Sequence, residues 1–111
     1  MAFTSVITEP EPTRAEIDAL PGPAVLEFGT PQCQFCRAAQ PFVAAAFAGH
    51  ALVHHIKVED GSGRRLGRSF GVRLWPTLVF LRDGRELARL VRPAGEAVIV
   101  QALASLELVR K

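Results

Sequence analysis

The two cysteines of the chain, Cys33 and Cys36, are separated only by Gln34 and Phe35. Thiols at this spacing can form a redox-active pair, half of a zinc site or a structural cross-link. Cys33 is predicted at the start of a helix, where unpaired backbone N–H groups and the positive end of the helix dipole favour a thiolate. We therefore expect Cys33 to be the nucleophile and Cys36, one turn later, to be the resolving thiol that attacks a mixed disulfide formed at Cys33.

A zinc site is the main alternative for these cysteines. Cys33, Cys36, His50 and His54 follow a C-x2-C-x13-H-x3-H pattern, which falls within the loose spacing of tetrahedral zinc ligands. However, Gly49 separates His50 from the preceding helix, and the composition around His54 favours a strand, whereas paired histidine ligands would need a helix. We therefore expect no bound metal.

Hydrophobic periodicity predicts the elements that position the thiols. The apolar run at residues 24–28, bounded by Pro and Gly, predicts a strand buried on both faces. The apolar positions from Cys33 to Ala48 suit a helix that Pro41 interrupts. The dithiol then falls at the carboxyl end of a strand where a helix begins, which is the edge where open α/β sheets place their sites.

The remaining elements complete an α/β pattern. Asp83 and Gly84 predict a hairpin, because Gly readily takes the positive φ that such a turn needs. Strands alternating with helices imply parallel pairing, and the hairpin adds an antiparallel edge. We expect a central mixed five-stranded sheet flanked by about four helices, in a single domain over residues 1–111. The other expected strands span 3–8, 51–58, 77–81 and 86–91, and the other helices span 13–20, 62–70 and 98–106.

Composition narrows the possible functions. The net charge is +2, and no block of like charges suggests a nucleic-acid partner. Residues 1–16 are polar and acidic, without the basic start and apolar run of a signal peptide or a membrane span, so we expect a cytoplasmic location. In that reducing setting, two thiols at this spacing favour redox chemistry over a stabilising cross-link.

Four features occur together in the chain, namely the Cys33-Gln34-Phe35-Cys36 motif, Pro41, the Trp75-Pro76-Thr77 segment and the Asp83-Gly84 hairpin. In their order and spacing they resemble the thioredoxin family, and the resemblance covers nearly the whole chain, from about Phe3 to Leu108. It implies the thioredoxin fold and reversible dithiol-disulfide exchange with protein or small-thiol disulfides. It also implies a monomer with a redox-active Cys33–Cys36 disulfide, no bound cofactor, and an external reductase or low-molecular-weight thiol as electron donor. From composition, we expect neither a membrane nor a nucleic-acid partner.

The resemblance also implies roles for residues away from the dithiol. Pro76 is expected to be cis and to face the thiols, leaving the backbone N–H and C=O of Trp75 to pair with an extended substrate. Glu27 stands where the family carries a buried acid, and burial would raise its pKa and let it accept the Cys36 proton. His55 is expected in place of the lysine that usually pairs with this acid. It is a candidate proton relay, although ordinary strand polarity explains it equally well.

Several positions depart from the family pattern. Gln34 and Phe35 replace a Gly-Pro pair, so the redox potential cannot be transferred. Gln34 is expected to contact the substrate, and Phe35 is either a substrate contact or a core residue. Trp75 is expected to cover the dithiol. Arg92 replaces a glycine that leaves a flat groove, and with Arg73 it would make this rim basic, which favours acidic partners unless both arginines simply face solvent.

Two other functions remain open at this point. The chain could be a non-catalytic thioredoxin-fold adaptor or chaperone whose dithiol is vestigial or regulatory. It could also be a glutaredoxin-like, glutathione-linked reductase, because an aromatic residue just before the second cysteine, here Phe35, is found there as well.

Overall fold

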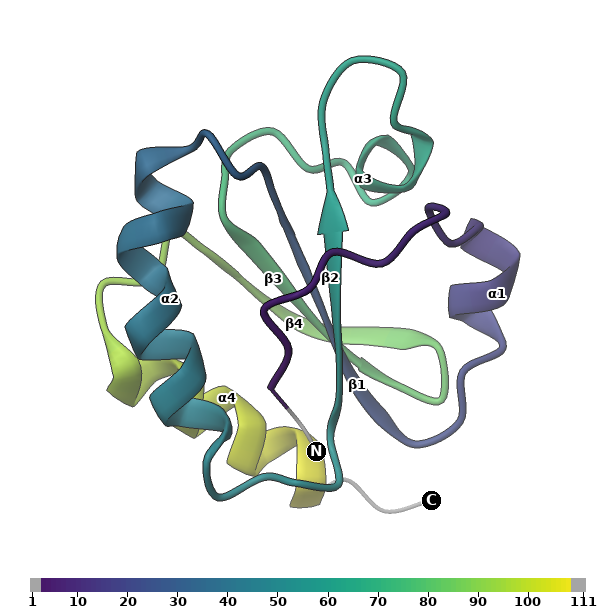
Figure 1. Ribbon diagram of the computed structural model, residues 1–111. Coiled ribbons are helices and arrows are strands. Elements are labelled where there is room, and N and C mark those ends of the chain that lie inside the picture. The colour runs from purple at the N-terminus through teal and green to yellow at the C-terminus, as the bar shows by residue number, and fades with distance from the viewer. Residues whose placement is uncertain (1–2, 109–111) are drawn as a thin grey trace.

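Strand β1 (Pro23–Gly29) lies inside the sheet, and residues 24–28 are buried, as their apolar run predicts. In the computed structural model, which describes residues 3–108, β1 pairs in parallel with β2 (His54–Glu59) and antiparallel with β3 (Thr77–Arg82). β4 (Arg85–Val91) pairs antiparallel with β3, giving the order β2-β1-β3-β4 (Figure 1). The α/β class and the mixed sheet are confirmed, but among the described strands only β1 and β2 pair in parallel.

The expectation of a fifth strand at residues 3–8 is wrong. Only Ile7 forms a bridge with Lys57 of β2, and the Thr8 N–H donates to the Lys57 carbonyl at 2.8 Å. Earlier in the segment, the Thr4 N–H donates to Nδ1 of His55 at 2.9 Å instead of to a strand carbonyl. The segment therefore passes over β2 without extending a ladder along it (Figure 1), and over residues 3–108 the sheet has four strands.

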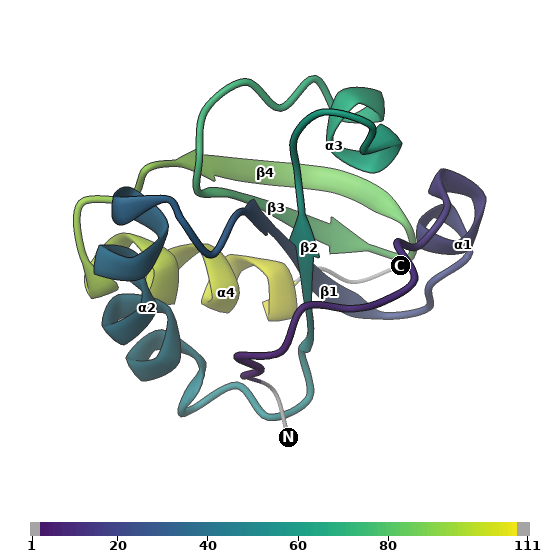
Figure 2. The same ribbon diagram turned by 45° about the horizontal axis from the view of Figure 1, so that its top comes forward.

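Helices cover both faces of the sheet, as Figures 1 and 2 show. One face packs against α2 (Gln34–Phe47) and α4 (Glu96–Leu108), and the other against α1 (Arg14–Asp18) and α3 (Arg65–Ser69). Each face buries its own apolar cluster, because successive side chains of a strand point to opposite faces. Within residues 3–108, no helix is long and apolar enough to cross a membrane.

Four elements are shorter than their sequence patterns predict, and one of them is α1, which covers only Arg14–Asp18 of the expected 13–20. β2 begins at His54, because residues 51–53 form a turn in which the Val53 N–H donates to the His50 carbonyl at 3.1 Å. α3 covers only Arg65–Ser69 of the expected 62–70, since Gly61 and Gly63 take positive φ just before it. α2 begins one residue after Cys33 and ends at Phe47, running unbroken through Pro41.

The predicted hairpin joins β3 to β4. Asp83 and Gly84 have φ of 51° and 78°, the two positive values of a tight hairpin turn. Asp83 also binds Gly22, with its N–H donating to the Gly22 carbonyl at 3.0 Å and its Oδ1 accepting from the Gly22 N–H at 2.8 Å. Gly84 lies so close to Asp18 that an added Cβ would collide with the Asp18 carbonyl. The turn therefore packs against the end of α1.

Replacing Gly84 by Ala should lower the free energy of unfolding by about 2 kcal/mol, because the substitution adds both a strained φ and this collision. Urea unfolding would measure the change. Gly49→Ala is the matched control, since an added Cβ there meets nothing within 4 Å, and it should shift stability by no more than about 0.5 kcal/mol. Equal stability of the two variants would contradict the prediction.

Candidate active site

The sulfur of Cys33 caps helix α2. Cys33 is the N-cap residue, with an extended backbone, and its Sγ accepts a hydrogen bond from the Cys36 N–H at 3.2 Å. This position is usually filled by the side-chain oxygen of Ser, Thr, Asp or Asn. A negatively charged sulfur is the better acceptor here, because it faces unpaired N–H groups and the positive end of the helix dipole.

The two thiols have pKa values shifted in opposite directions. Burial works against ionisation of Cys33, but hydrogen bonds from the Cys36 thiol and from the N–H groups of Cys36 and Phe35, together with the charge of Arg92, hold the pKa of Cys33 below its ordinary value. Burial, followed by the hydrogen bond to Cys33, raises the pKa of Cys36 to about 12. Cys36 is only 6% exposed, whereas Cys33 is half-buried. Cys33 is therefore the accessible thiol that ionises more readily, and Cys36 is its proton-bearing partner.

The end of β1 lies against the buried thiol. An added Cβ on Gly29, the last residue of the strand, would be 2.5 Å from Cys36 Sγ. The Gly29 carbonyl also accepts a hydrogen bond from the Asp60 N–H at 2.9 Å. A glycine at this strand end lets the first turn of α2 approach the sheet closely.

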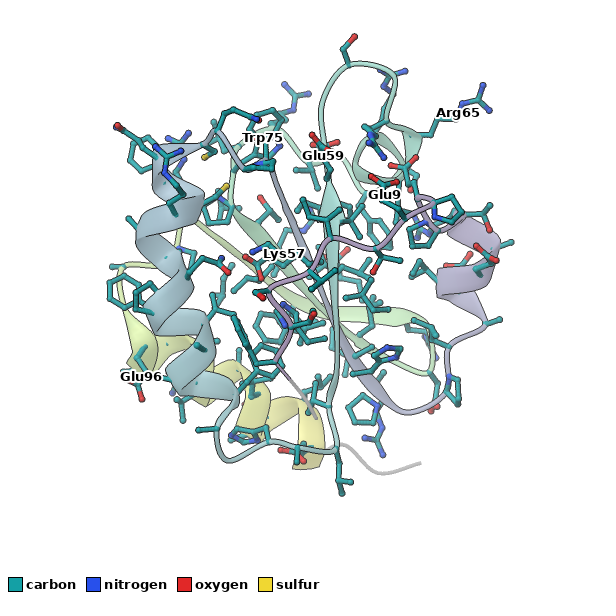
Figure 3. All side chains as sticks on the ribbon, viewed as in Figure 1. Glu9, Lys57, Glu59, Arg65, Trp75 and Glu96 are labelled. Atoms are coloured by element: carbon teal, nitrogen blue, oxygen red, sulfur yellow. The ribbon has the colours of Figure 1, made fainter. Side chains whose placement is uncertain are left out.

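The Trp75–Pro76 peptide bond is cis, as expected, and the Trp75 carbonyl faces the dithiol. The Cys33 Sγ lies 3.9 Å from that oxygen. This carbonyl already has a partner, because Nε of Arg92 donates to it at 2.9 Å; its expected pairing with a substrate stays a prediction. The indole N–H of Trp75 donates to Asp60 at 2.8 Å, so the contact with Cys33 is made by the backbone. Figure 3 shows Trp75 beside the start of α2.

Glu27 is buried on β1 and has three polar partners from two other elements. Its Oε1 lies 2.8 Å from Nε2 of His55, and its Oε2 accepts a hydrogen bond from Nε2 of Gln40 at 2.6 Å. Nζ of Lys57 lies 3.9 Å from Oε2 and donates to Oε1 of Gln40 at 2.6 Å. The carboxylate is therefore held by a closed polar network although it is only 2% exposed.

The expectation that burial raises the pKa of Glu27 is wrong. Burial does act in that direction, but the hydrogen bond and electrostatic attraction of His55 outweigh it, together with the charge of Lys57 and the Gln40 hydrogen bond. The net result is a pKa below the usual glutamate value. Glu27 is therefore ionised at neutral pH, which is the state that a proton acceptor requires.

Glu27 has both a lysine partner, Lys57, and His55, so His55 does not take the place of the lysine. Lys57 lies opposite Glu27 in the β1–β2 register, and Figure 3 shows it between β2 and α2. Nδ1 of the buried His55 accepts the Thr4 N–H at 2.9 Å, so Nε2 carries the proton that faces Glu27. The His55 ring also stacks on Phe47, with 4.6 Å between ring centroids.

A cavity of about 120 Å³ lies behind the dithiol. Cys36 and Glu27 both line it, together with Gln40, Lys57 and Thr30. The wall of the cavity is mostly apolar, but the side chains of Glu27, Gln40 and Lys57 line it next to Cys36. A space of this size has room for water between the thiol and the carboxylate.

The two residues between the cysteines are exposed, and Phe35 is a surface residue instead of a core residue. The Phe35 ring is 47% exposed, and the Arg92 guanidinium lies over it, 4.1 Å from its centroid. A shallow groove of about 100 Å³ runs beside it to Pro76. Gln34 is exposed in the same turn.

The zinc pattern does not assemble. Helix α2 begins after Cys33 and is 14 residues long, and His50 follows its far end. There His50 pairs with Glu107 of α4. His54 is exposed at the start of β2. Within residues 3–108, no group of three or more His, Cys, Asp or Glu side chains is arranged to hold a metal.

The sequence patterns did not single out Gln40 and Lys57, yet both contact Glu27. Gln40 follows Cys36 by one helical turn and so shares its helix face. Lys57 alternates with His55 along β2 and so points to the same side of the sheet. Both periodicities can be recognised in the sequence, but the sequence does not show which strand pairs with β1.

The chain is similar to known thioredoxins both in sequence and in structure. A model of the thioredoxin family matches residues 5–105. A thioredoxin from Aspergillus fumigatus is 31% identical over 70 residues, an alignment that spans 63% of this chain and 65% of that relative's length. The structure of thioredoxin 2 from Pseudomonas aeruginosa in its reduced form shares 54% identity and a TM-score of 0.83, covering 94% of this chain and 97% of that one. A Nicotiana alata thioredoxin shares the fold at 22% identity, with a TM-score of 0.71 and coverage of 84% and 80%.

Replacing Cys36 by Ala should slow alkylation of Cys33 by iodoacetamide at pH 7 several-fold. The substitution removes a thiol that donates to the Cys33 thiolate, and hydrogen bonds to charged groups contribute about 1.5–3 kcal/mol. Mass spectrometry of the modified chain against time would measure the rate. Cys36→Ser, which keeps a hydroxyl donor, should react at an intermediate rate. Unchanged reactivity in Cys36→Ala would contradict this account of the thiolate.

Proposed function

The chain belongs to the thioredoxin family, and on that premise we propose that it is a thiol-disulfide oxidoreductase that reduces disulfides through Cys33 and Cys36. The observation that carries the proposal is the Cys33 sulfur at the N-cap of α2, half-buried and hydrogen-bonded to the Cys36 N–H. A capped thiolate supports nucleophilic chemistry. An adaptor with a vestigial dithiol would not require the opposed pKa shifts of the two thiols.

In the first step, the Cys33 thiolate attacks one sulfur of a substrate disulfide. A mixed disulfide forms between Cys33 and the substrate, and the other substrate sulfur leaves as a thiolate. The exposed Phe35 ring and the groove that ends at Pro76 support apolar contact with the substrate. The carbonyl of Trp75, beside Cys33, supports pairing with the backbone of an extended substrate segment.

In the second step, Cys36 loses its proton and attacks the sulfur of Cys33. Loss of the Cys33 charge in the mixed disulfide removes two of the influences that raise the pKa of Cys36, its hydrogen bond to Cys33 and the repulsion between the two sulfurs. Glu27, ionised and lining the same cavity, accepts the proton. The Cys33–Cys36 disulfide forms and the substrate leaves with both of its sulfurs reduced.

His55 and Lys57 act on Glu27. His55 donates from Nε2 and keeps its proton there, because the Thr4 N–H occupies Nδ1. Lys57 compensates the buried negative charge directly and through Gln40. In this proposal His55 positions the acceptor and holds it ionised, whereas a relay would require Nδ1 to be free.

The catalytic cycle closes when an external donor, either a reductase dithiol or two equivalents of a low-molecular-weight thiol, returns two electrons to the Cys33–Cys36 disulfide and becomes a disulfide itself. The cysteines themselves carry the electrons, so the proposed chemistry needs no bound cofactor. A reducing compartment such as the cytoplasm keeps such a pair in its dithiol form. We propose that the chain works there as a monomer on disulfide-containing proteins.

The wild-type chain should accelerate the reduction of insulin by dithiothreitol, followed as turbidity, and Cys33→Ser should reduce the rate to the uncatalysed level. The serine hydroxyl is far too weakly acidic to replace the capped thiolate. No acceleration by folded wild-type protein would instead favour an adaptor. Full activity with glutathione in Cys36→Ser would favour the glutaredoxin-like mechanism, which needs only the first thiol.

Glu27→Gln should slow resolution of the mixed disulfide at pH 7 by about 100-fold, because proton transfer by a positioned group contributes about 10²–10⁴-fold. Quenched-flow mass spectrometry would show the Cys33 mixed disulfide accumulating. Since the pKa of Glu27 is lowered, the wild-type rate should lose this contribution only at acid pH, as Glu27 becomes protonated, and the variant should lack that step. Glu96→Gln, an exposed acid at the start of α4 (Figure 3), should leave resolution unchanged. Equal rates for Glu27→Gln and the wild type would eliminate Glu27 as the acceptor.

A further inference from the structure

The guanidinium of Arg92 lies beside the reactive sulfur. Its Nε donates to the Trp75 carbonyl at 2.9 Å, the same oxygen that lies 3.9 Å from Cys33 Sγ. Its Cζ lies 4.1 Å from the centroid of the Phe35 ring, in the geometry of a cation–π contact. A single cation therefore contacts both the loop carbonyl and the exposed aromatic ring that flank Cys33.

The backbone of Arg92 holds this side chain in place. Its φ of 50° lies in the left-handed region, which residues with a Cβ seldom adopt and which costs conformational free energy. Its N–H donates to the Pro76 carbonyl at 2.9 Å, so Arg92 is tied to the cis-proline loop by backbone as well as by side chain. A strained residue that is held by two contacts at a reactive centre indicates a functional constraint.

The charge of Arg92 is not balanced by an acid. Among residues 3–108, no carboxylate lies within ion-pair distance of Arg92, and only its Nε makes a side-chain hydrogen bond. The two terminal nitrogens remain as a planar pair of donors that matches a carboxylate. The groove beside them is apolar apart from Arg92 itself, and it is lined by Phe35, Ala38, Ala39, Phe42, Pro76 and Pro93.

We propose that Arg92 is a specificity residue that recognises an acidic side chain next to the substrate cysteine attacked by Cys33. The inference rests on the proposed disulfide reductase function and names the substrates that this site prefers. They are extended segments with Asp or Glu adjacent to the reactive cysteine. Segments with a basic residue at that position are disfavoured by like-charge repulsion.

A substrate can bind in this way without breaking the hydrogen bond between Arg92 and the Trp75 carbonyl. A carbonyl oxygen can accept two hydrogen bonds. When Cys33 is ionised it no longer donates to the Trp75 carbonyl, so this oxygen can bind a substrate N–H while Arg92 keeps its own bond. Residues adjacent to the attacked cysteine lie about 3.8 Å away along the substrate backbone. A carboxylate there reaches the terminal nitrogens of Arg92, where paired hydrogen bonds add geometric specificity to charge attraction.

Arg73, the other arginine expected at this rim, is exposed and makes no side-chain hydrogen bond or ion pair with the described residues. It therefore supplies charge without a fixed direction, whereas Arg92 is oriented by two contacts. Diffuse attraction by both arginines and directed recognition by Arg92 predict different results. Diffuse attraction would depend on both, but directed recognition depends on Arg92 alone.

The test uses disulfide-bridged peptides that differ only in a Glu, Gln or Lys next to the attacked cysteine. The wild-type chain should reduce the Glu peptide with a kcat/KM about fivefold above that of the Gln peptide, and the Lys peptide most slowly. Arg92→Gln should bring the Glu-to-Gln ratio close to one, and Arg92→Lys should restore part of it. The ratio isolates recognition, because any effect of the Arg92 charge on Cys33 reactivity affects all peptides alike.

Arg85→Gln is the matched control, since Arg85 is exposed at the opposite end of β4, about 20 Å away at 3.3 Å per residue, and the preference should persist. Equal rates for the Glu and Gln peptides in wild type would overturn the inference, as would a preference that survives in Arg92→Gln. Loss of the preference in Arg73→Gln to the same extent would also overturn it, in favour of diffuse attraction. Failure of the wild type to reduce any of the peptides would instead reject the proposed function.

Discussion

The structure depends on a sulfur atom used as a helix cap. Cys33 Sγ accepts the Cys36 N–H at the start of α2, a task that a small oxygen normally performs. The same sulfur also accepts a hydrogen bond from the Cys36 thiol. The contacts that cap the helix therefore also favour ionisation of Cys33. The fold brings other features to this point. β1 ends in a glycine against Cys36, and the Trp75–Pro76 loop brings its carbonyl to Cys33.

The second constraint is a buried negative charge. Transferring an ionised carboxylate out of water is costly unless its oxygens are paired. Glu27 meets this condition through His55, Gln40 and Lys57, and its lowered pKa shows that pairing outweighs burial. His55 in turn needs an N–H for its second nitrogen, which Thr4 provides. The Thr4 N–H, which could have taken part in a fifth strand, thus donates to His55 instead. His55 in turn binds Glu27.

The rim of the site combines an apolar groove with a single fixed cation. Arg92 is tied to the loop by its backbone N–H and to the Trp75 carbonyl by its side chain, so its charge has a definite place relative to Cys33. A freely solvated lysine would contribute a more diffuse attraction at the same position. The apolar groove at Phe35 and Pro76 and the charge of Arg92 therefore lie side by side at the rim of the site.

Local spacing and apolar periodicity predict the dithiol, the buried strand before it, the hairpin and the α/β class, because these patterns report directly on helix starts, strand burial and turns. The strand count, the direction of the Glu27 pKa shift and the partner of the Trp75 carbonyl follow only from the folded chain. Each depends on groups far apart in the chain, such as Thr4 with His55 or Trp75 with Arg92. Periodicity predicts the face on which a residue lies, but a pKa or a hydrogen bond depends on which atoms meet there, and strand pairing and register set that.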